Sequence, residues 1–339
     1  AAALSDAIEL DRLCEAMNLT RSWRDASRRL GFTQLRVHAD LGQGIAQVYL
    51  DQVRASGLPG HLPVVLGAGD GALSSVGSGA VNPGQLTAMI GTSGAVRMIS
   101  ATPKTDVQGR TWCYNLTDDY WVLGGAINNG GIALQWLRDK LAGPESLVAK
   151  SLGQDVYDLL TRYAEQVPSG SDGLLLLPFY TGERAPYWNA NARGVLFGLN
   201  LNHDKRHMVR ATLEGITYRM FSIFSALEEV SGGVQEIRVS GSFTRSRLWL
   251  QIMADIFGRT IRVPGEPQGS AFGASVLGMY ALGLLSDIKD VGNYMNITAE
   301  VQPNPDSHQL YKELFAIYQR VYWNLQQEFT AISAIQRKG

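Results

Sequence analysis

Three glycine-containing turns, each directly after an apolar strand-like run, constrain what this chain can fold into. They are Gly67-Ala68-Gly69-Asp70-Gly71, Gly91-Thr92-Ser93-Gly94 and Ser240-Gly241-Ser242. A glycine leaves the backbone N–H groups of a turn open to a ligand, and such turns hold phosphate in many proteins. Three of them, with an acid in the first and two hydroxyls in the second, indicate a phosphotransferase that binds ATP without a Walker loop.

Composition and charge narrow the class of partner. The 339 residues carry a formal net charge of −1, which does not favour a nucleic acid or a membrane surface as the main partner. There are two cysteines, Cys14 and Cys113, and no secretory signal, so we expect reduced thiols in a cytoplasmic protein rather than a disulfide. No apolar run approaches the ~18 residues of a membrane span.

Strands alternate with helices along the chain, which predicts an α/β protein. The predicted strands cover residues 62–66, 86–90, 95–99, 112–116, 120–124, 174–178, 236–240 and 260–263. The predicted helices lie within residues 1–60, after Asp70, and at 132–141, 203–231, 248–257, 270–282 and 308–330. A Pro, Gly, Ser and Asp cluster at Pro168–Asp172 is the expected break between two parts of the chain.

Each turn has two interpretations on its residues alone. Asp70 is either a general base at the end of a strand or the N-cap of the next helix. Gly91-Thr92-Ser93-Gly94 either binds phosphate oxygens or is a plain hairpin turn. Gly241-Ser242 either lets a nucleoside lie against the backbone or makes a tight strand-to-helix turn. Gly131, at a predicted helix start, either approaches phosphate or permits close packing.

Two further segments carry polar side chains. The loop Gly182-Glu183-Arg184-Ala185-Pro186-Tyr187-Trp188 either lines a cleft or is a packed loop with a Glu–Arg pair. His203 and His207 are four residues apart, but no Glu or Cys accompanies them. We therefore expect a helix face there and no metal site.

Taken together, these segments resemble the FGGY carbohydrate kinases. The most specific match is Gly194-Val195-Leu196-Phe197-Gly198-Leu199, then seven residues, then His207-Met208-Val209-Arg210-Ala211-Thr212-Leu213-Glu214, which follows the family's second signature. The segment Gly124-Gly125-Ala126-Ile127-Asn128-Asn129-Gly130-Gly131 resembles the gluconokinase branch. The resemblance covers roughly residues 60–330.

The resemblance implies roles for individual residues. Asp70 matches the family's catalytic base, which takes a proton from the sugar hydroxyl. The positions that match nucleotide-binding residues are Gly91, Thr92, Ser93, Gly131, Gln135, Gly241, Ser242 and Ser246. Ser242 stands where the family often has a second glycine, and Ser246 stands where some members have an Asn near the adenine.

The fold implied is actin-like, with two ribonuclease-H-like domains and a cleft for substrate and ATP. Residues 1–170 would be the remainder of the first domain, and residues 171–339 the complete nucleotide-binding domain. The implied reaction is Mg²⁺- and ATP-dependent phosphorylation of D-gluconate. The alternatives are a xylulokinase, or another pentulose or polyol kinase, or a non-catalytic nucleotide-binding remnant. A homodimer is the assembly that the family suggests.

The largest departure from the family lies at the front of the chain. The family opens with a phosphate-binding hairpin of Asp, Gly, Thr and Ser that also positions Mg²⁺, and no Asp-x-Gly-Thr segment precedes residue 60. Phosphoryl transfer depends almost wholly on positioning and charge stabilisation. We therefore expect a truncated chain that is weak or inactive as a catalyst on its own.

Overall fold

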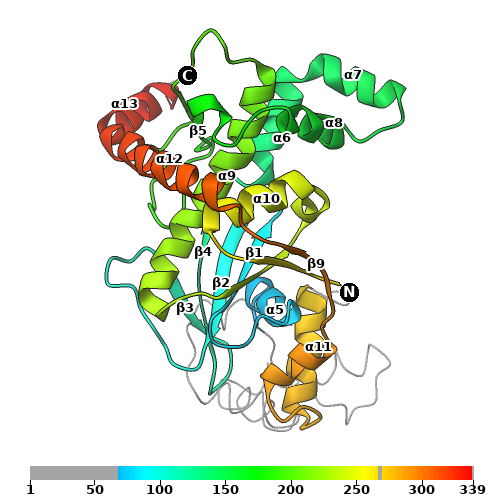
Figure 1. Ribbon diagram of the computed structural model, residues 1–339. Coiled ribbons are helices and arrows are strands. Elements are labelled where there is room, and N and C mark those ends of the chain that lie inside the picture. Colours follow the sequence, from blue (N-terminus) through cyan, green and yellow to red (C-terminus); the bar gives the residue numbers. More distant parts are fainter. Residues whose placement is uncertain (1–67, 266–268, 338–339) are drawn as a thin grey trace, which may run out of the picture.

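The computed structural model describes residues 68–265 and 269–337 (Figure 1). The helix expected within residues 1–60 and the strand expected at 62–66 lie outside these ranges, as do Gly67 and Cys14. No helix in the described ranges is long and apolar enough to cross a membrane.

A seven-stranded mixed sheet forms the centre of the molecule. Its strands, in spatial order, are β3 (Trp112–Asn115), β4 (Trp121–Ile127), β2 (Gly94–Ser100), β1 (Gln85–Ile90), β7 (Glu236–Ser240), β8 (Ile261–Pro264) and β9 (Ile297–Val301). β1, β7 and β8 are parallel, and the other pairs are antiparallel. A second, two-stranded antiparallel sheet pairs β5 (Leu175–Leu177) with β6 (Val195–Phe197).

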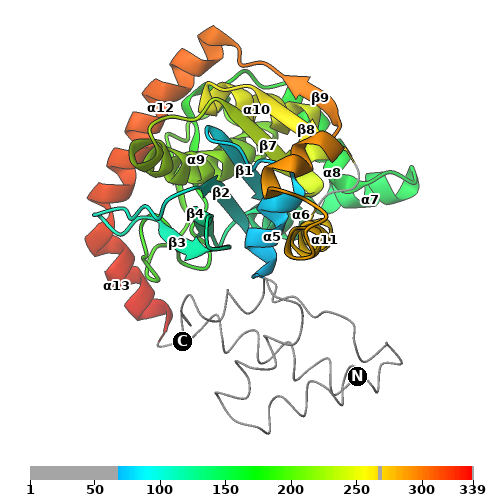
Figure 2. The same cartoon turned by 90° about the horizontal axis from the view of Figure 1, so that it is seen from below.

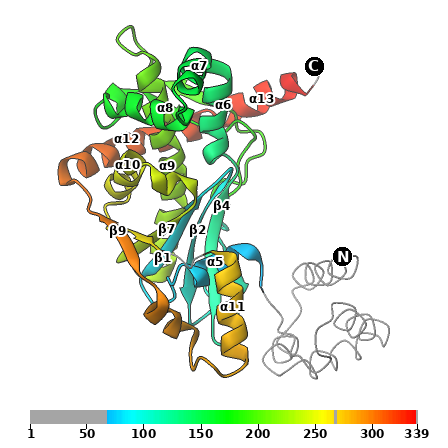
Figure 3. The same cartoon turned by 90° about the vertical axis from the view of Figure 1, so that its right-hand side faces the viewer.

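Helices cover both faces of the large sheet. The helices in the described ranges are α5 (Asp70–Gly77), α6 (Gly131–Leu141), α7 (Gly143–Ser151), α8 (Val156–Glu165), α9 (Lys205–Ser231), α10 (Arg247–Phe257), α11 (Ser270–Ala281), α12 (Pro305–Asn324) and α13 (Gln326–Gln336). Three short 3-10 helices are η1 (Ser171–Gly173), η2 (Ser242–Arg245) and η3 (Ile288–Tyr294). Figure 2 shows α9 and α10 on one side of the sheet and α5 and α11 on the other. Figure 3 shows α6, α7 and α8 gathered at one end of the molecule.

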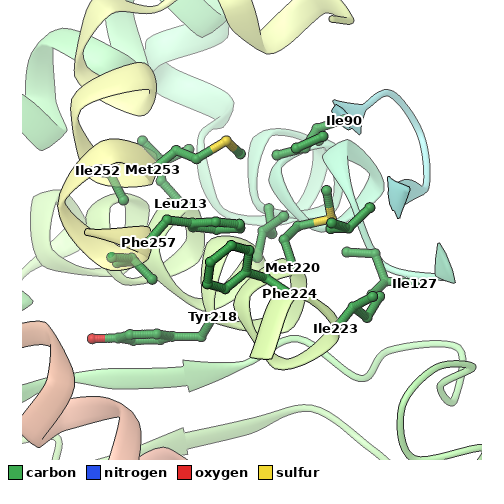
Figure 4. Close-up of a cluster of buried hydrophobic side chains, with 14 of the residues drawn as sticks. Ile90, Ile127, Leu213, Tyr218, Met220, Ile223, Phe224, Ile252, Met253 and Phe257 are labelled. Atoms are coloured by element: carbon green, nitrogen blue, oxygen red, sulfur yellow. The ribbon is translucent and has the colours of Figure 1, made fainter. Parts of the chain in front are cut away.

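The main core lies between the sheet and the α9–α10 layer. Ile90 of β1 and Ile127 of β4 meet Met220 and Phe224 of α9 and Phe257 of α10 in one apolar cluster (Figure 4). The pleat of β1 places every second side chain toward this layer. The sheet is therefore held from this side by side chains from distant parts of the chain.

The opposite face is covered by two helices that approach each other closely. A Cβ on Gly77 of α5 would lie 2.0 Å from the carbonyl oxygen of Gly269. A Cβ on Gly273 of α11 would lie 1.9 Å from the carbonyl oxygen of Leu73. Because only glycine permits this approach, the prediction of a closely packed small-residue helix after Asp70 is confirmed.

The expected division between residues 170 and 171 does not follow the large sheet. β1 pairs in parallel with β7, so the sheet takes strands from both sides of that boundary. The Pro168–Asp172 cluster is instead a connection within one unit, between α8 and β5. Local turn signals mark where the chain bends, but they do not tell which strands pair afterwards.

The single terminal helix expected at 308–330 is two helices, α12 and α13, which meet at Leu325. The amide of Gln326 would donate to the carbonyl of Tyr322 in a continuous helix. Its side-chain amide donates to that carbonyl instead, at 2.8 Å. A side chain inserted into the backbone ladder is a known cause of a helix break.

Candidate active site

The parallel pairing of β1 with β7 brings two of the predicted turns to one edge of the sheet. β1 ends at Ile90 and β7 ends at Ser240, so the turns that follow them start side by side. Gly241 has a φ of 103°, and a Cβ there would lie 2.3 Å from the carbonyl oxygen of Ile90. Glycine is therefore required at this position both for its backbone conformation and for the close approach.

The start of α6 joins the same edge. The amide of Gly131 donates to the carbonyl of Gly91 at 2.7 Å, and the amide of Gly130 donates to the carbonyl of Thr92 at 3.2 Å. A Cβ on Gly130 would lie 2.5 Å from the carbonyl oxygen of Ser93. The close packing expected of this glycine pair is therefore observed, and it places the first turn of α6 beside the 91–94 turn. The approach of these glycines to phosphate stays a prediction.

Several groups at this edge face open space. A Cβ on Gly91 would meet no atom within 4 Å, and the side chains of Thr92 and Ser242 are exposed. The N-terminus of α6 adds the partial positive charge of a helix end. The amides of Gly91, Gly130, Gly131 and Ile132 donate to carbonyls of the same edge. Two exposed hydroxyls and the partial positive charge of a helix end are what this edge offers a polyphosphate ligand.

Two predicted nucleotide-binding residues lie farther along the adjoining helices. Gln135 is exposed on α6, one turn after Gly131, and its side chain bonds Asp139. The hydroxyl of Ser246 accepts from the amide of Trp249 at 3.2 Å and caps α10. The cap leaves the hydroxyl proton of Ser246 free to donate, so its contact with a nucleotide stays a prediction.

Asp70 is the first residue of α5 and its side chain is exposed. Its carboxylate accepts from the amide of Gly71 at 2.7 Å. Gly69 occupies the N-cap position, so the alternative that Asp70 is the N-cap is wrong. The carboxylate is nevertheless favoured there by the helix dipole, and its role as a base stays a prediction.

A positive charge that the sequence analysis missed lies beside Asp70. Arg97 is on β2, and a Cβ on Gly71 would lie 2.5 Å from its Nη2. Burial lowers the pKa of the guanidinium, the charge of Asp70 raises it, and the charge of Arg184 lowers it. The signal was available in the sequence, since Arg97 interrupts the apolar run Ala95–Ile99.

The loop Gly182–Trp188 is packed around a buried ion pair. Glu183 is 3% exposed, and its Oε2 accepts from Nε of Arg219, a fully buried residue of α9, at 3.1 Å. The guanidinium also lies over the rings of Tyr187 and Phe179, 4.6 and 4.9 Å from their centroids. The loop is packed, as one interpretation expected, but Glu183 pairs with Arg219 of α9 and not with an arginine of the loop.

This loop also fixes the residues that precede the α6 glycines. Oε1 of Glu183 accepts from the amide of Asn128 at 2.8 Å. Asn129 is fully buried, donates to the carbonyl of Gly182 at 2.8 Å, and accepts from the Thr181 hydroxyl at 3.1 Å. The buried ion pair is therefore connected through two asparagines to the edge of the sheet that carries the 91–94 turn, the start of α6 and Gly241. We call this edge the glycine-turn edge.

The charged residues of the motif at 194–214 serve the fold. Oε1 of the buried Glu214 accepts from Nε of Arg210 at 2.8 Å, from the hydroxyl of Tyr311 at 2.7 Å and from the amide of Gly170 at 3.0 Å. These bonds join α9 to α12 and to the segment before β5. His207 bonds Asp204 and caps α9. In the described ranges, no group of three or more His, Cys, Asp and Glu residues could hold a metal ion.

Comparison with family models gives two matches. Residues 86–282 match the model described as the FGGY family of carbohydrate kinases, C-terminal domain, and this match runs across the expected boundary at 170. Residues 1–82 match a model described as UreF. The second match reaches the described residues only at α5 and the turn after it, so nothing about the glycine-turn edge rests on it.

Individual relatives agree with the first match. The chain is 44% identical over 282 residues to a gluconokinase from Bacillus subtilis, covering 83% of this chain and 55% of the relative. It superposes with a TM-score of 0.76 on a gluconate kinase from Lactobacillus acidophilus, at 33% identity, covering 83% of this chain and 56% of that one. A ligand-bound xylulose kinase from the same organism gives a TM-score of 0.75, also at 33% identity, with 83% and 56% covered.

These matches confirm the predicted actin-like fold over the part of the chain that they cover. The chain spans about half the length of the curated relatives it matches, 55% in the case of the Bacillus protein.

Proposed function

Because this chain belongs to the FGGY family of carbohydrate kinases, we propose that it binds ATP at the glycine-turn edge and phosphorylates D-gluconate on its terminal hydroxyl. The observation that carries the proposal is the convergence of the 91–94 turn, the Gly130–Gly131 start of α6 and Gly241. Gluconate is favoured as the substrate by the 44% identity to a gluconokinase.

The nucleotide would lie along this edge with its phosphates at the 91–94 turn and its adenosine toward Gly241. Gly91, Thr92 and Ser93 would contact the phosphates of ATP, since no described atom lies within 4 Å of a Cβ on Gly91 and the Thr92 hydroxyl is exposed. The remaining proposed contacts come from Gly131 and Gln135, beside the nucleotide, and from Gly241, Ser242 and Ser246, on its adenosine side.

Asp70 would act as the general base. Its carboxylate would accept the proton of the terminal hydroxyl as that oxygen attacks the γ-phosphorus, and the bond to the β-phosphate oxygen would break to release ADP. An exposed carboxylate at the start of α5 is free to reach a hydroxyl. Positioned bases of this kind contribute about 10²–10⁴ in rate.

Magnesium would bind at this edge only together with ATP, as a complex with its phosphates. Mg²⁺ in kinases is held by one or two carboxylates together with substrate phosphates. The described residues offer no acidic cluster, so the phosphates would supply most of the ligands, and the exposed Asp70 at the start of α5 is the candidate carboxylate. When bound, the ion would neutralise charge on the transferring phosphoryl group.

Two measurements on the same sample test the proposal: ATP binding by calorimetry, and sugar-dependent ADP release with gluconate and with xylulose. We expect ATP binding and slow, gluconate-dependent ADP release, in line with the weak catalysis expected of this chain on its own. ADP release with xylulose alone would favour the alternative suggested by the xylulose kinase neighbour. ATP binding without release for any sugar would support a nucleotide-binding chain that does not catalyse transfer, and absence of ATP binding would refute the proposed site.

A further inference from the structure

Arg97 is a charged residue inside an apolar strand. Its neighbours along β2, Val96 and Met98, are at most 4% exposed and pack toward α9 and α10. Because side chains alternate along a strand, Arg97 lies on the opposite face, with α5. A partly buried guanidinium on that face requires a reason, since arginines are rarely buried without a partner.

Arg97 lies beside a glycine and an indole of the neighbouring strands. In register across the sheet, Arg97 pairs with Gly124 of β4, and Gly124 pairs with Trp112 of β3. A Cβ on Gly124 would lie 2.7 Å from Cη2 of Trp112, so glycine lets the indole lie over this strand. The guanidinium is 5.9 Å from the centroid of the indole ring. These residues therefore form a group in which an indole covers Gly124 and the Arg97 guanidinium is the cationic end.

The charge of this cationic end is not neutralised within the part of the chain that the structure describes. Arg97 makes no hydrogen bond or ion pair through its guanidinium there, although Asp70 is close enough to raise its pKa. Arg184 is close enough to lower it. Two cations beside one carboxylate leave a net positive site, which favours an anionic ligand.

We propose that Arg97 binds the carboxylate of the sugar-acid substrate and so selects an acid over a neutral sugar, an inference that rests on the proposed function. The fork of a guanidinium matches a carboxylate with two parallel hydrogen bonds. A neutral sugar in the same place leaves the guanidinium half-buried and without an anion, which disfavours it.

The spacing along β2 suits a six-carbon acid. Arg97 follows Gly94 by three residues, a distance of about 10 Å along a strand. An open six-carbon chain measures roughly 8 Å from its terminal hydroxyl to its carboxylate, given C–C bonds near 1.5 Å. The substrate would therefore place its hydroxyl end toward the 91–94 turn and its acid end at Arg97.

The test compares D-gluconate with D-glucitol, which has the same six carbons and a hydroxyl in place of the carboxylate. Calorimetry gives both dissociation constants for the wild type, Arg97→Met and Arg97→Lys. We expect gluconate to bind the wild type more tightly than glucitol by roughly 10–150-fold, as for hydrogen bonds to a charged group. The ratio falls close to 1 in Arg97→Met and takes an intermediate value in Arg97→Lys, because lysine keeps the charge but lacks the fork.

Chemical labelling locates the carboxylate independently of any variant. Phenylglyoxal modification of the wild-type chain is mapped by peptide mass spectrometry with gluconate or glucitol present. We expect gluconate, but not glucitol, to protect Arg97, while Arg320, exposed on α12, is modified equally in both samples.

Three results would overturn the inference. An unchanged gluconate-to-glucitol ratio in Arg97→Met, with gluconate still bound, would refute the role of Arg97 and leave the proposed function intact. Weaker ATP binding in Arg97→Met at an unchanged ratio would assign Arg97 to the phosphates. A wild-type chain that binds xylulose or no sugar, but not gluconate, would refute the proposed function and this inference with it.

Discussion

Replacing Arg219 by methionine is expected to destabilise the fold by about 3–5 kcal/mol, as breaking a buried ion pair does. Arg219 is fully buried and donates from Nε to Glu183, which is itself 3% exposed. Methionine fills a similar volume but leaves the carboxylate of Glu183 buried without its cation. It also removes the bond from Nη2 of Arg219 to the carbonyl of Ala185, which measures 2.8 Å.

Thermal unfolding measures this loss directly. At roughly 2–4 °C per kcal/mol for a domain of this size, Arg219→Met should lower Tm by roughly 6–20 °C. The matched control is Arg245→Met, because the side chain of Arg245 is 69% exposed and its Nη2 makes a long surface ion pair with Asp155 at 3.4 Å. A surface pair of this kind contributes about 0–1 kcal/mol. A Tm for Arg219→Met no lower than that of the control would refute the reasoning.

The double variant separates the ion pair from general packing. Glu183→Gln keeps an oxygen that accepts from the amide of Asn128, so the loop geometry has a reason to persist. Combined with Arg219→Met, it removes both charges, and we expect the double loss to be smaller than the sum of the singles by about 0.5–3 kcal/mol. Strict additivity would show that the two side chains do not stabilise each other.

Three further predictions concern the glycine-turn edge. Asp70→Ala should lower gluconate-dependent ADP release by about 10²–10⁴ and leave the ATP dissociation constant nearly unchanged; unaltered turnover would remove Asp70 from the mechanism. Thr92→Val should weaken ATP binding by roughly 1–3 kcal/mol, measured by calorimetry, and an unchanged constant would count against a phosphate contact. Gly130→Ala should lower Tm, since its Cβ would lie 2.5 Å from the carbonyl oxygen of Ser93, whereas Gly91→Ala should leave Tm unchanged and weaken ATP binding; the reverse order of Tm effects would contradict the packing described.

Most elements of the fold follow from local patterns in the sequence. The strand predicted at 236–240 coincides with β7, and the helix predicted at 132–141 begins one residue later than α6. Apolar runs between glycine turns decide these elements without help from the rest of the chain. Which strands pair with each other does not follow from these local patterns, because the pairing of β1 with β7 depends on apolar side chains that distant segments bury together. For that reason the boundary expected near residue 170 does not match the sheet.

In the candidate site, too, some residues could be predicted from local sequence patterns and others only from contacts between distant segments. The glycines at 91, 130 and 241 were recognisable from the turns that contain them, and at 130 and 241 each marks a backbone approach that a side chain would block. Arg97 and Arg219 were missed, although each is a charge within an apolar run. Such a charge signals a buried partner, but its identity depends on strand register and helix packing. Only the fold shows that Arg219 meets Glu183.

The parallel pairing of β1 with β7 also has a consequence for how the chain is made. β2 follows β1 after only a few residues and can pair with one of its edges at once. The other edge of β1 pairs with β7, and residues 91–235 must be synthesised before β7. At synthesis rates of about 5–20 residues per second, that wait lasts roughly 7–30 s. During this interval the nascent chain carries an apolar strand with an open hydrogen-bonding edge, which is a template for aggregation. Chaperone dependence during expression should therefore fall sharply once residues 236–240 have left the ribosome.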